Sequence, residues 1–456
     1  MTRIRLRSSL SVFPFLALFL PLSGISAQPG APIIVTSAPV FDELAALSAP
    51  DGERFPKGAH LLLVTGGKRE SLAPNFAASA DANVSFDGKT VLFAGKENAG
   101  NPWKIWEMTI SDHSVRLVAE GETDMVRPLY LPGKRVVYAH RGKHGFALEA
   151  VSLDGAGLVE LSQIQASALP VDVMQDGRVL FEAGFPLGTW GKPELYLVYS
   201  DGSGVESYRC DHGIARWGGH QLTSGDVIFT HGSKLAKFTS PLATENPVAA
   251  PAAEYAGQIA ETPSTAWLAA TRKQTPKGDG RYALSILRPG SAILQPIYAD
   301  PANNLVEPVL LMQRATPKRH PTALHDWTTA NLLALDVRIS REGDLKQIPP
   351  TVRLEQQDEN GTAVTMGTSP IEPDGSFYIK VSGDRPIRFT LLDPQGKTVR
   401  AEHGWFWIRA GEQRICVGCH VGPEHAPENR VPQVLLRTIT PLDLSGTAAK
   451  AAAGGN

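Results

Sequence analysis

The chain has 456 residues, of which 42% are hydrophobic, and this length and composition suit two or three packed domains. Its 44 lysines and arginines nearly balance its 46 aspartates and glutamates, and no basic run is interleaved with aromatic residues. This balance argues against a nucleic-acid-binding surface, which needs a local excess of positive charge.

Residues 1–27 have the features of a secretory signal peptide. Three arginines precede an apolar run at residues 10–22, and a small-residue cleavage site ends at Ala27. An anchoring helix is the weaker interpretation, because the run is too short to span a bilayer and two prolines interrupt it. We therefore expect an exported, periplasmic protein that begins near Gln28 and has no membrane span after cleavage.

Residues 28–312 contain a repeated pattern, in which a glycine-led turn precedes a β-branched and aromatic strand. The turn glycines recur at intervals of 45, 44 and 48 residues: Gly88, Gly133, Gly177 and Gly225. Each interval has the size of one β-propeller blade. A fifth unit lies at residues 282–294, and the N-terminal strands PIIVT and HLLLVT could complete a sixth with residues 306–312. We expect a six-bladed β-propeller, with seven blades as the alternative.

A second, smaller β domain follows the propeller. Residues 313–320 are basic, contain proline and lack periodicity, as is typical of a linker. Residues 321–413 hold short strand patterns between Asp-Gly, Gly-Asp and Pro-Gln-Gly turns, which predict a small antiparallel β-sandwich that ends at the cysteine motif. The fold class is therefore all-β. Residues 438–456 are small and polar, and we expect a flexible tail there.

The segment 414–437 opens with RICVGCH, which holds two of the three cysteines of the chain. Cys416, Cys419 and His420 form Cys-x-x-Cys-His, the attachment motif of c-type haem. The two thiols bind the haem covalently, and the adjacent imidazole is an axial ligand of the iron. Because export supplies the compartment where this attachment takes place, we expect one covalent haem c. A redox disulfide and a zinc-binding pair are the alternatives.

The second axial position of the iron decides between electron transfer and catalysis, since a closed site only relays electrons and an open one can bind substrate. His425 is one candidate ligand, although it follows His420 by only five residues. The other candidates are His320, His325, Met366 and His403. For each of these histidines a solvated loop position is the alternative.

The sequence GWFWIRAGEQR precedes the motif and predicts a strand. Alternation sends Trp405 and Trp407 to one face of this strand and Phe406 to the other. We expect these aromatic side chains to pack in the sandwich core, to form an apolar wall of the haem site, or both. Candidate partners for the haem propionates are Arg409, Arg414 and Arg430.

The third cysteine, Cys210, lies in the sequence YRCDHGIARWGGH with Asp211, His212 and His220 close by. Cysteine, histidine and aspartate are zinc-capable ligands, so a metal site or a contact with the haem edge is one interpretation. A buried, inert thiol is the other. If His420 binds a metal instead of the haem iron, Cys210 is its natural co-ligand.

Two stretches of the chain resemble known families. The repeats, for example SFDGKTVLFAG, resemble TolB-like (PD40) propeller blades, and residues 370–432 resemble the haem-binding middle domain of the hydrazine synthase alpha subunit. Together the likeness covers residues 32–437. The resemblance implies a tyrosine iron ligand four residues after the motif histidine and a zinc shared by that histidine and a propeller cysteine. Position 424 is a glutamate here, which indicates a relative of the family rather than a hydrazine-forming enzyme, while Cys210 and His420 could keep the zinc.

We therefore expect an exported monohaem c-type cytochrome with its haem beside the propeller. An electron-transfer subunit predicts six-coordinate iron and a redox partner protein. An oxidoreductase acting on a small nitrogen or oxygen compound predicts five-coordinate iron facing a pocket near Cys210. The alternative from outside redox catalysis is a propeller binding or scaffold protein in which the haem is structural or a redox sensor.

Overall fold

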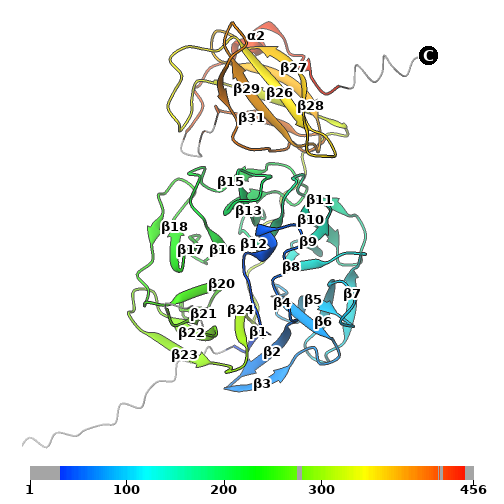
Figure 1. The fold of residues 1–456 in the computed structure, drawn as a ribbon, viewed down its shortest axis with the longest axis vertical. Coiled ribbons are helices and arrows are strands. Elements are labelled where there is room, and N and C mark those ends of the chain that lie inside the picture. The colour runs from blue at the N-terminus through cyan, green and yellow to red at the C-terminus, as the bar shows by residue number, and fades with distance from the viewer. Residues whose placement is uncertain (1–30, 275–279, 420, 422–424, 447–456) are drawn as a thin grey trace, which may run out of the picture.

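The computed structural model describes residues 31–274, 280–419, 421 and 425–446. The described chain is all-β, as the sequence predicts, and its two short helices are α1 (Ala45–Ser48) and α2 (Gln433–Arg437). A ring of sheets and a smaller sandwich lie side by side (Figure 1). Neither helix has the length and hydrophobicity that a membrane crossing needs, within the part of the chain described.

The ring contains, within the described residues, six four-stranded antiparallel sheets. Sheet 1 consists of β24 (Asn304–Leu310), β1 (Ile33–Ala38), β2 (His60–Thr65) and β3 (Lys68–Ser71). Sheet 2 consists of β4 (Ala78–Val84), β5 (Thr90–Lys96), β6 (Lys104–Thr109) and β7 (Val115–Ala119). Sheet 3 consists of β8 (Met125–Leu131), β9 (Arg135–Gly142), β10 (Gly145–Ser152) and β11 (Val159–Glu160).

The chain continues around the ring in the same order. Sheet 4 consists of β12 (Ala168–Val173), β13 (Val179–Phe185), β14 (Lys192–Val198) and β15 (Glu206–Ser207). Sheet 5 consists of β16 (Trp217–Gln221), β17 (Val227–His231), β18 (Lys234–Phe238) and β19 (Asn246–Pro247). Sheet 6 consists of β20 (Glu254–Glu261), β21 (Trp267–Arg272), β22 (Ala283–Leu287) and β23 (Leu294–Tyr298). This arrangement of sheets is that of a β-propeller.

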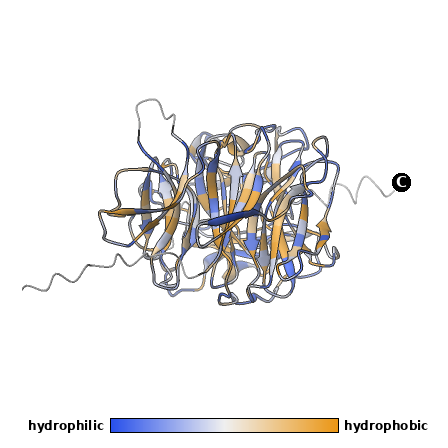
Figure 2. Ribbon diagram, turned by 90° about the horizontal axis from the view of Figure 1, so that it is seen from below, coloured by the Kyte–Doolittle hydropathy of each residue, from blue (hydrophilic) through white to orange (hydrophobic). Residues whose placement is uncertain are grey.

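Apolar side chains on the strands hold neighbouring sheets together. Phe93, Phe181 and Phe229 occupy equivalent places in β5, β13 and β17, and each is fully buried. Burying one such side chain stabilises the fold by about 2 to 3 kcal/mol. In Figure 2 much of the hydrophobic colouring lies on the strands, whereas many connecting loops are hydrophilic. The sheets therefore depend on one another for burial.

The two ends of the ring share sheet 1. β24 pairs antiparallel with β1, so that Leu310 lies opposite Ile33 and Asn304 opposite Ala38. The sequence analysis expected the N-terminal strands to form a sheet with residues 306–312, and this pairing is present. It closes the ring by hydrogen bonds between its first strand and its last strand in the sequence.

Buried charges join the sheets on the axis of the ring, and we call Arg54, Asp81, Arg127, Glu182 and Glu307 the axial network. Each is at most 9% exposed. Asp81, Arg127 and Glu307 have φ values of 58°, 51° and 54° at irregularities of β4, β8 and β24, which re-aim their side chains. Arg127 pairs with Glu182 at 3.2 Å and with Glu307 at 3.3 Å, and Arg54 pairs with Asp81 at 2.8 Å and also with Glu307. Four of the sheets are thereby linked by ion pairs.

The long connection between β1 and β2, residues 39–59, covers one end of the axis and carries α1. Arg54 anchors it to the axial network, and Glu43 anchors it to sheets 5 and 6. The Glu43 carboxylate accepts hydrogen bonds from the Gly257 backbone at 2.6 Å and from the Trp217 indole at 3.1 Å. Burial raises the pKa of Glu43 to about 7, and the neighbouring Glu182 carboxylate adds to the shift.

The raised pKa of Glu43 makes stability depend on pH. The folded protein holds the Glu43 proton up to a pKa of about 7, whereas the unfolded chain releases it near the ordinary glutamate pKa of 4.5. The stabilisation is therefore fully present below pH 4.5 and is lost as the pH rises through 7, by about 3 kcal/mol in all. Urea unfolding from pH 4 to 8 should show this decline in the unmodified protein and not in Glu43→Gln. Equal slopes in the two proteins would contradict it.

The predicted linker, residues 313–320, has no regular secondary structure and lies against hairpin turns of the ring. A Cβ atom on Gly88 would lie 2.8 Å from the backbone nitrogen of Gln313, and one on Gly177 would lie 2.1 Å from the carbonyl oxygen of Lys318. Both glycines have positive φ, at 74° and 90°. Only glycine therefore fits at these turns, because the backbone of the turn needs a positive φ and because residues 313–320 leave no room for a Cβ atom.

The sandwich has two sheets. Sheet 7 contains β31 (Gln413–Cys416), β25 (Thr329–Ala334), β28 (Phe377–Ser382) and β32 (Leu442–Asp443) in this order. Sheet 8 contains β27 (Ala363–Pro370), β26 (Thr351–Gln357), β29 (Ile387–Leu392) and β30 (Thr398–Ala401). Apolar residues of both sheets form one buried cluster.

The sandwich differs from the predicted one in two ways. β31 pairs in parallel with β25, and β32 pairs in parallel with β28, so sheet 7 is mixed. The sandwich also continues past the cysteine motif instead of ending there, because β32 lies in the stretch predicted as a tail. Both differences arise because distant segments add to the edges of a three-dimensional sheet, which strand spacing along the sequence does not reveal.

Candidate functional site

The cysteine motif begins on an edge strand of the sandwich. Cys416 is the last residue of β31, and its carbonyl accepts a hydrogen bond from the Leu335 backbone at 2.9 Å. The Cys419 backbone donates to the carbonyl of Ile339 at 3.0 Å. These bonds hold the motif on both sides of its turn. His420 and Glu424 lie outside the described residues.

The two motif thiols are free and half-buried against the sandwich core. Burial raises the pKa of Cys416 to about 11, against a weaker opposing effect of the Arg414 charge. Burial and the Glu402 carboxylate raise the pKa of Cys419 to about 12. Burial therefore favours the neutral thiol form of both cysteines.

Gly418 gives the motif its tight turn. A Cβ atom at this position would lie 2.6 Å from the carbonyl oxygen of Ile339, where real Cβ atoms are not found. The same carbonyl binds the Cys419 backbone. Only glycine therefore lets the turn approach the loop of residues 335–341, and this approach fixes the spacing of the two thiols.

Arg414 shares a strand face with the first thiol. Residues 414 and 416 are both half-buried on β31, whereas Ile415 on the opposite face is 62% exposed. Arg414 Nε donates to Glu412 at 2.6 Å, and Nη1 donates to the carbonyl of Val205 at 3.0 Å. Nη2 is buried and has no partner among the described residues. One N–H group next to Cys416 is thus left for an acceptor, such as a carboxylate.

The other two candidate arginines also have carboxylate partners. Arg409 forms an ion pair with Asp384 at 2.9 Å, and its buried Nε, like Arg414 Nη2, has no partner among the described residues. Arg430 pairs with Asp374 and, at 2.9 Å, with Glu428. Arg414 is the better candidate for a ligand carboxylate because it shares a strand face with Cys416.

Glu412 ties the motif strand to the propeller, and the sequence analysis missed it. This carboxylate is 9% exposed and accepts hydrogen bonds from Arg414 Nε, from the Arg409 backbone at 3.0 Å and from the Gly204 backbone at 3.4 Å. Its position two residues before Arg414 is the one sequence signal that could have indicated the pair.

The Trp-Phe-Trp side chains alternate as predicted, but the strand predicted for them is absent: only Phe406 pairs, in an isolated bridge with Ile387, and the strand begins at Gln413. Phe406 packs against Phe389 in the sandwich core, with ring centroids 5.6 Å apart. Trp407 is 1% exposed, belongs to a buried cluster of sheets 3 and 4, and donates to the Gly202 carbonyl at 3.4 Å. Trp405 donates its backbone N–H to Leu187 at 3.0 Å. Both tryptophans thus contact the propeller, and their role as a haem wall stays a prediction.

Cys210 and the cysteine motif contact the same loop of the sandwich. The carbonyl of Arg209, next to Cys210, accepts a hydrogen bond from Arg341 at 3.2 Å, and residue 341 follows Ile339 in the loop that binds Cys419. Burial raises the pKa of the Cys210 thiol to about 11. The propeller cysteine therefore lies on the side of the propeller that faces the motif.

The sequence neighbours of Cys210 have other partners. Asp211 forms two bonds with Arg216, at 2.7 and 2.9 Å. His212 pairs with Glu194 at 2.7 Å, and His220 pairs with Asp172 at 3.0 Å. No group of three metal-binding side chains occurs within the described residues, which do not include His420. A zinc shared by Cys210 and His420 stays a prediction.

Three of the candidates for the second axial position are exposed histidines. His425 is exposed, and exposed His403 pairs with Glu342. His325 is exposed and lies 2.7 Å from Gln413 of β31. The remaining two are His320, stacked on Tyr199 at 3.9 Å, and Met366, at the edge of the sandwich core.

A cavity lies next to the motif and was not anticipated from the sequence. It measures about 300 Å³ including space open to solvent. Its lining comes from the loop after β25, from the motif and from the segment before α2: Leu335, Asp336, Ile339, Val417, Pro427 and Arg430, among others.

Residues 342–421 match the family model described as the hydrazine synthase alpha subunit middle domain. This segment of the chain is therefore similar to that middle domain. Cys416 and Cys419 of the motif lie near the end of the matched segment.

The fold is similar to that of hydrazine synthase from Kuenenia stuttgartiensis over 90% of this chain and 71% of that chain, with a TM-score of 0.74 and 15% identity. TolB from Acinetobacter baumannii is similar over 63% of this chain and 68% of its own, with a TM-score of 0.47 and 16% identity. At 15% identity, the likeness to hydrazine synthase concerns the fold. A comparison with the curated proteins found no match.

Proposed function

We propose that the protein is an exported monohaem c-type cytochrome that transfers electrons to or from a redox partner protein. Cys416 and Cys419 bind one haem c covalently, and His420 is an axial ligand of its iron. The six four-stranded sheets are the blades of the propeller beside which this haem lies. The single observation that carries the proposal is the Cys-x-x-Cys-His sequence with both thiols free on one turn.

The described residues fit such a group. The thiols are unpaired, as addition to the two vinyl groups of a haem requires. Arg414 Nη2, on the face of β31 that carries Cys416, suits a propionate carboxylate. Gly418 and Ile339 hold the turn, and Glu412 orients Arg414 by accepting a hydrogen bond from its Nε. When bound, a haem c supplies an iron that takes up and releases one electron.

Small-molecule redox chemistry is the second candidate function. The observation that favours it is the cavity beside Val417, which would give a small compound a place next to the motif. On this alternative the iron keeps an open position, whereas an electron carrier has both axial positions filled.

The test is expression of the full chain, with its N-terminal segment, in a host that matures c-type cytochromes. The proposal expects periplasmic protein whose mass exceeds that of the polypeptide by one haem after denaturation, together with Soret absorbance. A polypeptide of unchanged mass and no Soret band would overturn it. Cyanide or nitric oxide then separates the two functions, because ready binding favours the oxidoreductase and unchanged spectra favour the electron carrier.

A further inference from the structure

The axial network has unequal numbers of charges. Among the described residues it brings the carboxylates of Asp81, Glu182 and Glu307 together with the guanidinium groups of Arg54 and Arg127. One negative charge is therefore left over inside the ring. Burying an uncompensated charge is costly, so a site of this kind favours an additional positive group.

The unfilled hydrogen-bonding position lies on Glu307. Its Oε1 accepts from Arg54 and, at 3.3 Å, from Arg127. Its Oε2 is buried and has no hydrogen-bond donor among the described residues. Glu307 as a whole is 9% exposed, so solvent does not readily supply that donor. Both oxygens of a buried carboxylate normally have partners. Glu307 thus belongs to a network with one excess negative charge, and its own Oε2 lacks a hydrogen-bond donor.

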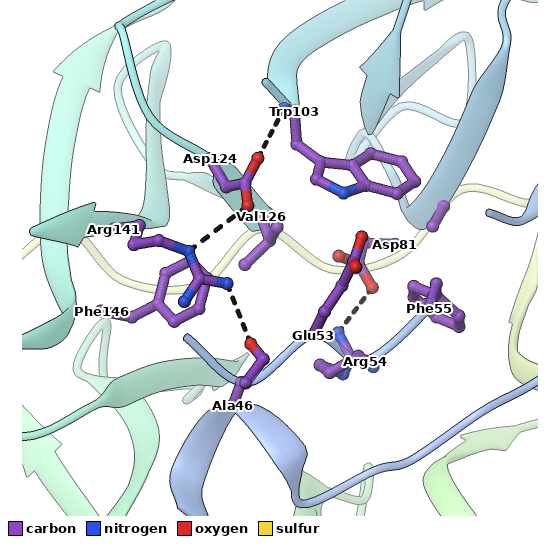
Figure 3. Close-up of a pocket in the computed structure, with 12 residues that line it drawn as sticks. Ala46, Glu53, Arg54, Phe55, Asp81, Trp103, Asp124, Val126, Arg141 and Phe146 are labelled. Atoms are coloured by element: carbon purple, nitrogen blue, oxygen red, sulfur yellow. Dashed lines mark hydrogen bonds and ion pairs between the residues drawn. The ribbon is translucent and has the colours of Figure 1, made fainter. Parts of the chain in front are cut away.

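A cavity adjoins Glu307 on one side of the axial network. The Arg54–Asp81 ion pair, drawn in Figure 3, borders a different cavity, which Ala46 of α1 also lines. The cavity at Glu307 has polar and apolar lining residues. The polar ones are Asp81, Arg127, Gln258 and Glu307, and the apolar ones include Pro128 and Val309. The amide of Gln258 offers a further acceptor for a group bound to Glu307.

We propose that this cavity binds the protonated amino group of a small primary amine, with Glu307 Oε2 as its charged acceptor. A primary ammonium group carries the one positive charge that the network lacks, and its N–H groups suit Oε2 and the Gln258 amide. A divalent metal ion fits less well, because no group of three metal-binding side chains occurs within the described residues. The site is independent of the haem proposal, since it lies on the ring axis.

The experiment uses the full-length protein and methylammonium chloride as the probe, with tetramethylammonium chloride as the control. Both ions carry one charge, but tetramethylammonium has no N–H group. Saturation-transfer NMR on the methyl protons, at constant ionic strength, measures binding of each. We expect methylammonium to bind and to raise the thermal midpoint, and tetramethylammonium to do neither. Equal behaviour of the two ions, or no binding of either, would overturn the proposal.

Variants then assign the site. Glu307→Gln keeps the shape of the side chain and removes its charge, and we expect methylammonium binding to weaken at least tenfold. Glu149→Gln is the matched control, because Glu149 is a half-buried carboxylate on β10, away from the axis, and we expect its affinity to be unchanged. Unchanged binding in Glu307→Gln would overturn the assignment. If that variant does not fold, the comparison of the two ions on the unmodified protein still decides.

Discussion

Replacing both Cys416 and Cys419 by serine should abolish covalent haem attachment completely. Serine has nearly the same size but cannot form the thioether bonds, so the loss follows from chemistry and not from misfolding. The two thiols lie at the edge of the sandwich core, and the backbone bonds of the turn do not involve the side chains. Periplasmic protein from a cytochrome-maturing host should therefore have the polypeptide mass and retain its β-sheet circular dichroism.

Cys210→Ser is the matched control for this double variant, since it makes the same change at the third cysteine. Cys210 is also a half-buried thiol with a raised pKa, but it lies outside the motif. We expect haem attachment in Cys210→Ser to equal that of the unmodified protein. Covalent haem in the double variant, or its loss in Cys210→Ser, would contradict the assignment of the motif.

Trp407→Ala should lower the free energy of unfolding by about 3 to 5 kcal/mol, the usual cost of removing a buried aromatic side chain from a core. Trp407 is 1% exposed and packs among residues of sheets 3 and 4, although it belongs to the sandwich part of the chain. Its removal leaves a cavity between the two parts and leaves the Gly202 carbonyl without its donor. Urea unfolding measures the loss.

Trp327→Ala serves as the control for Trp407→Ala. Trp327 is 43% exposed and stacks on His325, so its removal should cost no more than about 1 kcal/mol. Limited proteolysis adds a second readout, because the loss of Trp407 should expose the contact region around residues 202–205. A cost for Trp407→Ala as small as that of the control would refute the inference that this side chain joins the two parts.

The repeat of the propeller was readable from the sequence because sheets 2 to 5 use the same glycine-containing hairpin turn between their first and second strands. Gly88, Gly133, Gly177 and Gly225 all lie in this turn and all have positive φ. In sheet 6 the equivalent turn contains Thr265 with a φ of 58° instead of a glycine. The fifth unit was therefore recognised only from its later strands.

The axial network was not predictable in the same way. Asp81, Arg127 and Glu307 are separated by 46 and 180 positions in the sequence, and they meet because the ring closes. Each stands in an apolar strand, where a charged residue is normally evidence against burial. Their positive φ values at strand irregularities depend on the pairing of neighbouring strands, which only the folded chain defines.

The candidate site was only partly predictable. The spacing of Cys416, Cys419 and His420 identifies a haem motif because the chemistry of attachment fixes it. The surroundings of the motif depend on the packing of the sandwich against the propeller. Alternation gave the opposite faces of Trp405 and Phe406, but the propeller as the partner of Trp405 could not be derived from it. Glu412 was missed because, in the sequence alone, a buried glutamate cannot be distinguished from a glutamate that faces solvent.

Residues 313–320 also bear on how the two halves can move. This stretch adheres to successive hairpins of the ring, with Gln313 against Gly88 and Lys318 against Gly177, and little slack chain is left before β25 begins. A cytochrome that carries electrons by swinging between two distant docking positions needs a loose tether. Here such a movement would first have to detach residues 313–320 from the hairpins and break the hydrogen bonds that Glu412 accepts. These contacts hold the sandwich against the propeller, so under the proposed function a redox partner would have to come to the haem.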